Sequence, residues 1–183
     1  MCACLLLSAL GPWCLGGAVH LGLSQPCSED NMTEASLVVG KNRVVFDPTW
    51  CRTCKVCEVA CSILKEGQAR PALARLRILF DEFAASDPIT GRLCAHCADA
   101  PCLAACPNQA MTRDARTGAV LVIAENCTGC MKCRAACPWR IPVRHPERKI
   151  ACKCDLCYDR AEGPLCVAVC PLTGKALRYE TMD

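Results

Sequence analysis

Cysteines in short, repeated spacings are the residues of this chain that could do chemistry. The chain has 183 residues, 21 of them cysteine, and from residue 51 onward the cysteines fall into four motifs. Each motif ends in C-x3-C, and in three of them a proline follows directly. The motifs are Cys51, Cys54, Cys57 and Cys61; Cys94, Cys97, Cys102 and Cys106; Cys127, Cys130, Cys133 and Cys137; and Cys154, Cys157, Cys166 and Cys170.

The spacing within each motif is typical of an iron–sulfur cluster. Three thiolates on one tight loop can reach three corners of a cubic cluster, and the fourth cysteine lies about one helical turn further on. In the bacterial C-x2-C-x2-C-x3-C-P run, that fourth thiolate binds the other cluster. We therefore expect each motif to supply three ligands to one [4Fe-4S] cluster and one ligand to a partner. All of these cysteines are then metal ligands, and four motifs hold four [4Fe-4S] clusters.

Disulfides and zinc are the alternatives for so many cysteines. A short chain above about 8–10% cysteine is usually a secreted disulfide scaffold. Here, however, the count is odd and the thiols lie in tight clusters. Structural zinc typically takes two C-x2-C pairs, a pattern that the fourth motif alone satisfies. The first and third motifs fit it poorly, but a zinc-binding structural module stays open as a hypothesis of another class.

The elements that must position these loops are short. Aromatic residues make up only 4% of the chain, so a large aromatic core is not expected and bound metal should help to hold the fold. The fold class is predicted to be α+β, a doubled βαβ-type ferredoxin pattern with many short strands and helices. Strands are predicted at 43–47, 74–80, 110–114, 119–123 and 176–180, with 110–114 and 119–123 forming a hairpin, and helices at 54–64, 103–106, 130–137 and 166–170.

The whole set of motifs resembles a known family. The stretches CAHCADAPCLAACPNQA and KCDLCYDRAEGPLCVAVCPLTGKAL carry the likeness, which covers roughly residues 42–180. They are similar to the four-cluster electron-transfer subunits of molybdenum and tungsten oxidoreductases, such as dimethyl sulfoxide reductase and formate dehydrogenase. Polyferredoxin subunits of tungsten aldehyde oxidoreductases, carbon monoxide dehydrogenases and hydrogenases are also similar.

The resemblance implies two nested bacterial-ferredoxin-like units. The inner unit would cover 84–145, and the outer unit would join 42–83 to 146–183. One inner cluster would be held by Cys94, Cys97, Cys102 and Cys137, and the other by Cys106, Cys127, Cys130 and Cys133. The outer clusters would be held by Cys51, Cys54, Cys57 and Cys170, and by Cys61, Cys154, Cys157 and Cys166. Some relatives have tryptophan for one cysteine of the third motif, but Cys130 is intact here, so four four-iron clusters are expected.

The function expected is electron transfer, not catalysis, because no set of residues with catalytic spacing is present. The chain would relay single electrons as the small subunit of a molybdenum- or tungsten-containing oxidoreductase complex. Its partners would be a catalytic large subunit of the molybdopterin or tungstopterin type and a second redox partner. The alternative is a freestanding polyferredoxin, or a partner of a hydrogenase or carbon monoxide dehydrogenase. The formal charge of +3 ignores the clusters, so no nucleic-acid partner is inferred.

Several residues beside the motifs are not counted as ligands. His96 lies between Cys94 and Cys97, but that motif has all of its cysteines, so a histidine ligand is not expected. Cys152 could replace Cys154, although the KCDLC pattern of the family favours Cys154 and leaves Cys152 a free, buried thiol. The basic residues in or beside the motifs are expected on the solvated surface, with an effect on the reduction potentials as the alternative: Arg52, Lys55, Lys132, Arg134 and Lys153.

The N-terminal part, residues 1–41, is predicted to be a disordered extension or a mis-assigned start. Residues 2–23 are apolar, but no Lys or Arg precedes Lys41, which argues against an export signal. Met32 is the predicted native start, with an anchor or an unusual signal as alternatives. Only thirteen residues follow Cys170, so no C-terminal membrane helix is expected. We therefore predict a cytoplasmic protein without a membrane span, in which Cys2, Cys4, Cys14 and Cys27 are not ligands.

Overall fold

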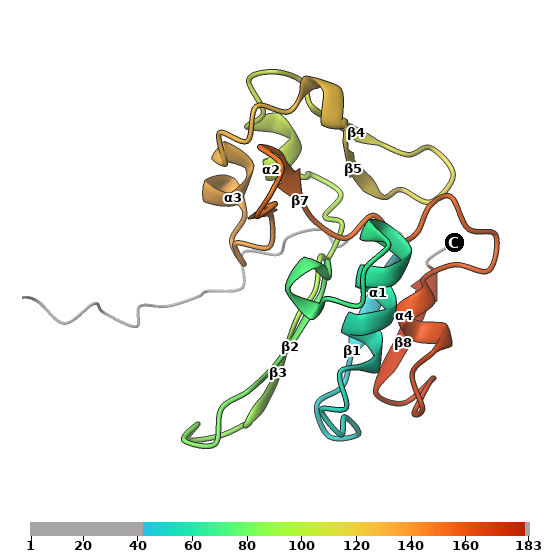
Figure 1. Ribbon diagram of the computed structural model, residues 1–183. Coiled ribbons are helices and arrows are strands. Elements are labelled where there is room, and N and C mark those ends of the chain that lie inside the picture. Colours follow the sequence, from blue (N-terminus) through green and yellow to red (C-terminus); the bar gives the residue numbers. More distant parts are fainter. Residues whose placement is uncertain (1–41, 182–183) are drawn as a thin grey trace, which may run out of the picture. The chain divides into compact units, whose positions relative to one another are not determined.

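The computed structural model describes residues 42–181, which belong to one compact unit. The predictions about residues 1–41 lie outside the described residues. Figure 1 shows short elements joined by long loops. The strands are β1 (Asn42–Phe46), β2 (Arg77–Phe80), β3 (Ile89–Arg92), β4 (Met111–Arg113), β5 (Val120–Val122), β6 (Val143–Arg144), β7 (Ala151–Cys152) and β8 (Leu177–Thr181). The helices are α1 (Val56–Glu66), α2 (Pro101–Ala104), α3 (Lys132–Ala136) and α4 (Leu165–Ala168), with 3-10 turns at Pro71–Leu73 and Ala124–Asn126.

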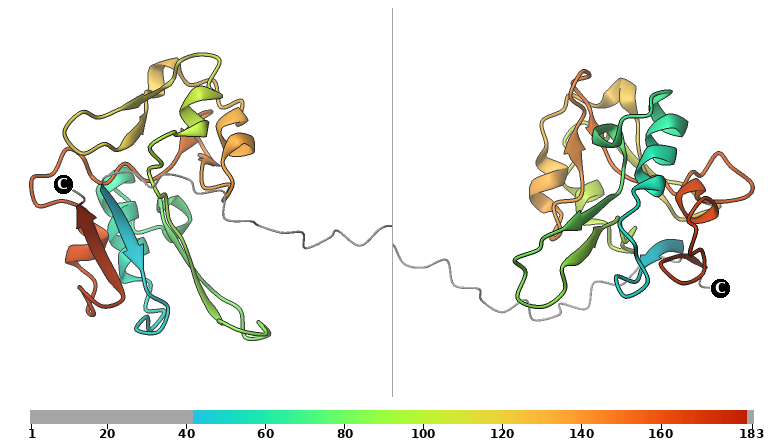
Figure 2. Two further views of the ribbon diagram at one scale, coloured as in Figure 1. Left: turned by 180° about the vertical axis from the view of Figure 1, so that it is seen from behind. Right: turned by 60° about the horizontal axis from the view of Figure 1, so that its bottom comes forward.

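The strands form two-stranded antiparallel sheets, in the order β1–β8, β2–β3, β4–β5 and β6–β7. The predicted hairpin is present as β4 and β5, with Thr112 opposite Leu121. Its turn uses Gly118, whose φ of +68° suits glycine. Strands β1 and β8 come from opposite ends of the described chain, with Val44 opposite Tyr179, and Figure 2 shows them side by side. The α+β class with short elements is thus confirmed.

The helices pack in two pairs, α1 against α4 and α2 against α3. Each pair brings together helices from two different cysteine motifs. Helix α1 ends at Gly67, whose φ is +68° and whose N–H donates to the Ile63 carbonyl at 2.9 Å. Helix α2 begins with Pro101, which is well suited to the first turn of a helix because its missing N–H is not needed there. Cys57 and Cys166, which are far apart in the sequence, therefore belong to the same buried cluster.

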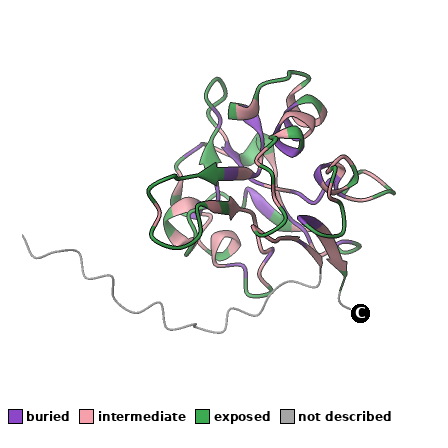
Figure 3. Cartoon of the chain, turned by 90° about the horizontal axis from the view of Figure 1, so that it is seen from below, coloured by how far each residue is buried: buried purple, intermediate pink, exposed green. Residues whose placement is uncertain are grey.

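The core consists of two small groups of buried residues. One group lies around α1, β1, β2 and β8 and includes Ile78, Leu156 and Leu177, and the other lies around β4 and β5 and includes Met111 and Val120. Cysteines belong to both groups. Figure 3 shows buried residues interleaved with half-buried ones along most of the elements. A core with so few large side chains is consistent with a fold that bound metal helps to stabilise.

Between residues 42 and 181, no helix has the length and apolarity required to span a membrane. The apolar stretch at residues 2–23 is not part of this range. The predicted cytoplasmic location stays a prediction.

Candidate metal centres

Four cavities are lined by cysteines from the predicted motifs. Each contains the four cysteines that the family resemblance groups together, and one of the cavities is also lined by a fifth, Cys94. Their role as ligands stays a prediction. Cavity A is lined by Cys51, Cys54, Cys57 and Cys170; cavity B by Cys61, Cys154, Cys157 and Cys166; cavity C by Cys94, Cys97, Cys102 and Cys137; and cavity D by Cys106, Cys127, Cys130 and Cys133.

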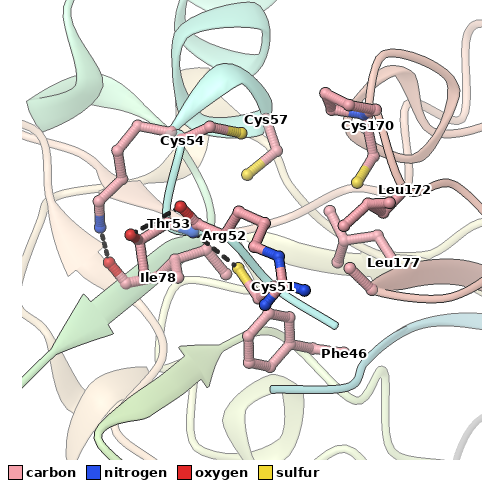
Figure 4. A pocket seen from close by; sticks show the side chains of 13 residues that line it. Phe46, Cys51, Arg52, Thr53, Cys54, Cys57, Ile78, Cys170, Leu172 and Leu177 are labelled. Carbon is pink, nitrogen blue, oxygen red and sulfur yellow. Dashed lines mark hydrogen bonds between the residues drawn. The ribbon is translucent and has the colours of Figure 1, made fainter. Parts of the chain in front are cut away.

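Cavity A is the widest of the four, at about 340 Å³. Figure 4 shows the thiols of Cys54, Cys57 and Cys170 directed toward one space, with Phe46 and Leu177 on its walls. Cavities B, C and D hold only about 20 Å³ each. The cysteine side chains of these three cavities would have to move apart to make room for a cluster. The donor set of each cavity nevertheless fits a [4Fe-4S] cluster, because it provides four thiols and little competing polar surface.

Each helix, together with the residues that directly follow it, provides cysteines to two neighbouring cavities. On α1, Cys57 lines cavity A and Cys61, one turn later, lines cavity B. The same two cavities are reached in the opposite order from α4, because Cys166 on the helix lines B and Cys170, two residues after its end, lines A. The pair α2 and α3 connects cavities C and D in the same way. Cys94 lines both B and C, so the cavities follow one another in the order A, B, C, D.

The four cysteine loops share one unusual backbone conformation. The residue before the second cysteine has a left-handed φ in every motif: +52° at Thr53, +49° at His96, +66° at Gly129 and +57° at Leu156. Residues other than glycine adopt this conformation rarely, and a cluster of such residues is typical of functional loops. Backbone that alternates in handedness can turn successive N–H groups toward one anion. The loops are therefore suited to surround negatively charged sulfur.

Backbone N–H groups already donate to several cysteine sulfurs. The N–H groups of Thr53 and Leu156 lie 3.4 Å from Sγ of the cysteine two residues earlier, at Cys51 and Cys154. Further N–H···Sγ contacts join Arg75 to Cys61 at 3.4 Å, Ala110 to Cys106 at 3.2 Å and Ala151 to Cys127 at 3.3 Å. Donors in such positions stabilise thiolate ligands and tune a bound cluster.

Burial raises the pKa of several thiols in these cavities. It is the largest cause that raises the pKa of Cys57 and of Cys154 to about 12, and the pKa of Cys97 and of Cys133 to about 11. Neighbouring cysteines of the same cavity add to the effect, as Cys54 and Cys170 do at Cys57. Because only the thiolate binds metal, iron would have to displace these protons.

The arrangement suits a cluster better than disulfides or a single ion. All cysteines in the described part of the chain are free. Among residues 42–181, no group of three or more His, Cys, Asp or Glu side chains is arranged to hold one metal ion. Zinc would need all four sulfurs at about 2.3 Å from one point. A cluster of four irons would instead bind each thiolate at a separate iron.

Cys152 does not line any of cavities A to D. It is buried in β7 and faces a fifth cavity of about 450 Å³. Cys154 lines cavity B, so the structure brings Cys154, not Cys152, together with Cys157 and Cys166.

One prediction about the basic residues is wrong. Lys153 is not on the solvated surface: only 3% of the residue is exposed, and it lines cavity C. Its ammonium group donates to the Cys154 carbonyl at 2.8 Å and to the Val120 carbonyl of β5. The burial follows from the position of Lys153 between β7 and motif four, where its side chain reaches Val120 of β5. In the sequence, only its position between Cys152 and Cys154 could have indicated this burial.

The loop of the second motif is fixed onto the β4–β5 hairpin. Arg113 on β4 donates to the carbonyl groups of Cys97 at 2.6 Å and Ala98 at 2.9 Å. The Val120 N–H donates to Nδ1 of His96 at 3.0 Å. Burial is the main cause that holds the pKa of His96 well below its usual range, and the positive charges of Lys153 and Arg113 lower it further. The spacing of the cysteines in the sequence did not indicate these contacts.

A buried ionic network, also not predicted, supports cavity B. The carboxylate of Asp155 lies 2.9 Å from Lys65 Nζ and 2.9 Å from Arg75 Nη1, and it accepts the Cys157 N–H at 3.0 Å. Arg75 also lies 3.5 Å from Glu66 on α1. These contacts join motif one to motif four across about eighty residues of sequence.

Comparisons with known proteins agree with this chemistry. Residues 87–179 match the family model described as 4Fe-4S dicluster domain. The chain is 36% identical over 131 residues to the aliphatic sulfonate oxidoreductase, polyferredoxin-like subunit, of Pyrococcus furiosus, covering 72% of each chain. It is 34% identical over 149 residues to the thiosulfate reductase electron transfer subunit PhsB of Salmonella typhi, covering 76% of each.

Among solved structures, the chain is similar to the active site complex BamBC of benzoyl coenzyme A reductase bound to benzoyl-CoA. The identity is 22%, the match covers 78% of this chain and 80% of the other, and the TM-score is 0.44.

Proposed function

Because the chain belongs to the family of 4Fe-4S ferredoxin-type electron-transfer subunits, we propose that it holds four [4Fe-4S] clusters and relays single electrons along them. It would do so as the small subunit of a molybdenum- or tungsten-containing oxidoreductase complex. The observation that carries this proposal is that each of four cavities is lined by three cysteines of one motif and one of its partner motif, with Cys94 as a fifth at cavity B.

The proposed ligands are the cysteines that line the cavities. The nested division into an outer unit, 42–83 with 146–183, and an inner unit, 84–145, is supported by the pairing of β1 with β8 and by the helix pairs α1–α4 and α2–α3. When bound, each cluster supplies one-electron chemistry. The chain would contribute thiolates, N–H donors to sulfur and a buried, largely apolar setting.

The order of the cavities supports a path with two ends. Cys54 at cavity A and Cys130 at cavity D are exposed, whereas the cysteines of B and C are buried or half-buried. Electrons could therefore enter at one terminal cavity and leave at the other, while the middle cavities stay shielded from water. We assign the two ends to a catalytic subunit of the pterin type and to a second redox partner.

Exposed apolar side chains support the role of a subunit. In the β2–β3 hairpin, strand β2 ends at Phe80, which is 59% exposed, and the connection between β2 and β3 carries Phe83, which is 87% exposed. Figure 1 shows this hairpin extending away from the helices. Exposed aromatic groups of this kind often mark protein interfaces.

Purification of the chain from its native source under anaerobic conditions tests the proposal. We expect a stable complex with a larger subunit, and molybdenum or tungsten in that complex together with iron. Isolation of the iron-loaded chain alone would contradict the subunit assignment. A complex without molybdenum or tungsten would contradict the choice of enzyme class.

A further inference from the structure

His96 has one ring nitrogen in use and one without a partner. Only 1% of the residue is exposed, and it lines cavity C together with Cys94, Cys97, Cys102 and Cys137. Its Nδ1 accepts the N–H of Val120 at 3.0 Å. A backbone N–H can only donate, so Nδ1 must be unprotonated. The neutral ring then carries its hydrogen on Nε2.

Nε2 of His96 is buried and has no hydrogen-bond partner among residues 42–181. A buried donor is rarely left unpaired, because removing it from water has no compensation. Lys153 also lines cavity C, but its ammonium group can only donate, and the carbonyls of Val120 and Cys154 accept from it. Among the other side chains that line the cavity, the only acceptors are the sulfur atoms of the cysteines.

The corresponding position in the other three motifs has no comparable donor. Thr53, Gly129 and Leu156 share the left-handed backbone of His96. Glycine and leucine have no polar side chain, and the Thr53 hydroxyl donates to the Arg52 carbonyl at 2.8 Å. The repeated loop therefore presents a side-chain N–H to its cavity at this position only in motif two.

We propose that His96 donates a hydrogen bond from Nε2 to a sulfur of the cluster in cavity C and thereby raises the reduction potential of that cluster. The inference rests on the proposed function, because it requires a cluster in that cavity. Reduction adds one negative charge, and a fixed donor stabilises the more negative state more strongly. The buried Lys153 acts in the same direction. The cluster in cavity C would then be easier to reduce than it would be without this donor.

The test uses the full chain, loaded with iron and sulfide under anaerobic conditions, and a redox titration followed by electron paramagnetic resonance. In His96→Leu, we expect one cluster to become about tenfold harder to reduce, which is a fall of about 59 mV for one electron. His96→Gln keeps an amide N–H near the position of Nε2 and should recover most of the shift. A merely structural role would not be rescued in this way.

His145→Leu is the matched control. His145 is also buried, but its Nδ1 accepts the N–H groups of Glu147 and Arg148, and its Nε2 lies 3.3 Å from Glu66. It lines none of cavities A to D, so no potential should change. Four unchanged potentials in a fully iron-loaded His96→Leu variant would overturn the role of His96. A wild-type chain that binds no cluster in cavity C would instead overturn the proposed function.

A measurement on the wild-type protein covers the case in which the leucine variant does not fold. In protein labelled with 15N-histidine, electron–nuclear double resonance of the reduced clusters should detect one histidine nitrogen. Absence of that coupling in a fully loaded sample would refute the hydrogen bond.

Discussion

Substitution of Asp155 should weaken the fold around cavity B. Its carboxylate is the shared partner of two cations, Lys65 and Arg75, each at 2.9 Å, and of the Cys157 N–H at 3.0 Å. The side chains of Asp155, Lys65 and Arg75 are only 12%, 8% and 20% exposed. Asp155→Ala would therefore remove the nearest carboxylate from two poorly hydrated cations and the acceptor from the Cys157 N–H group.

The size of the effect follows from these contacts. Removing one member of a buried ion pair costs about 3–5 kcal/mol. The lower end applies here, because Lys65 keeps Asp159 at 3.3 Å and Arg75 keeps Glu66 at 3.5 Å. We expect about 3 kcal/mol for Asp155→Ala, and about half of that for Asp155→Asn, whose amide oxygen can still accept the Cys157 N–H.

The rate of cluster loss is the suitable assay, because loss of the clusters on unfolding is irreversible. Anaerobic bleaching of the visible absorbance at a fixed temperature should be up to about a hundredfold faster for Asp155→Ala and about tenfold faster for Asp155→Asn. Asp159→Asn is the control. The Asp159 side chain is 59% exposed, and the change should stay below about fivefold. Bleaching of Asp155→Ala at the wild-type rate would refute the reasoning.

Three further predictions concern the ligands, a loop and the metal. Cys61→Ser should lower the iron content by about four atoms, because it removes a ligand of cavity B, while Cys152→Ser should not change it; equal losses would contradict the assignment. Gly129→Ala should prevent loading of cavity D, since φ is +66° and the new Cβ would lie 2.6 Å from the Lys149 carbonyl oxygen. Gly118→Ala is the control, because φ is +68° there too but no atom lies within 4 Å of the new Cβ. It should lower the free energy of unfolding by only about 1 kcal/mol, so iron analysis should show a loss for Gly129→Ala and none for Gly118→Ala. Removal of iron by a chelator should abolish cooperative thermal unfolding, as followed by circular dichroism, and an unchanged transition would show that the clusters do not support the fold.

The sequence was most informative where chemistry is local. Cysteines of one motif are close in sequence and therefore close in space. The cysteine loops and the helices after them could for this reason be predicted to within a few residues. The β4–β5 hairpin had a clear turn signal and was found at Met111–Arg113 and Val120–Val122. The grouping of cysteines around cavities A to D came from the family resemblance, and iron binding by them stays a prediction.

Features that depend on distant contacts could not be read from the sequence. Strands β3, β6 and β7 have at most four residues, and β3 contains Gly91, so they carry no alternating pattern. In the sequence, Lys153 resembles any surface lysine. It is buried because the fold brings it against Val120 of β5, which is distant in the sequence. The Asp155 network likewise depends on α1 lying beside motif four.

The central claim is that four motifs share their thiolates crosswise among four cubic clusters. The most direct measurement is iron and acid-labile sulfide per chain in the anaerobically reconstituted protein, with Mössbauer spectroscopy to identify the cluster type. The account predicts about sixteen irons and sixteen sulfides, all in [4Fe-4S] clusters. Zinc in place of iron, or about eight irons in a fully folded chain, would contradict it.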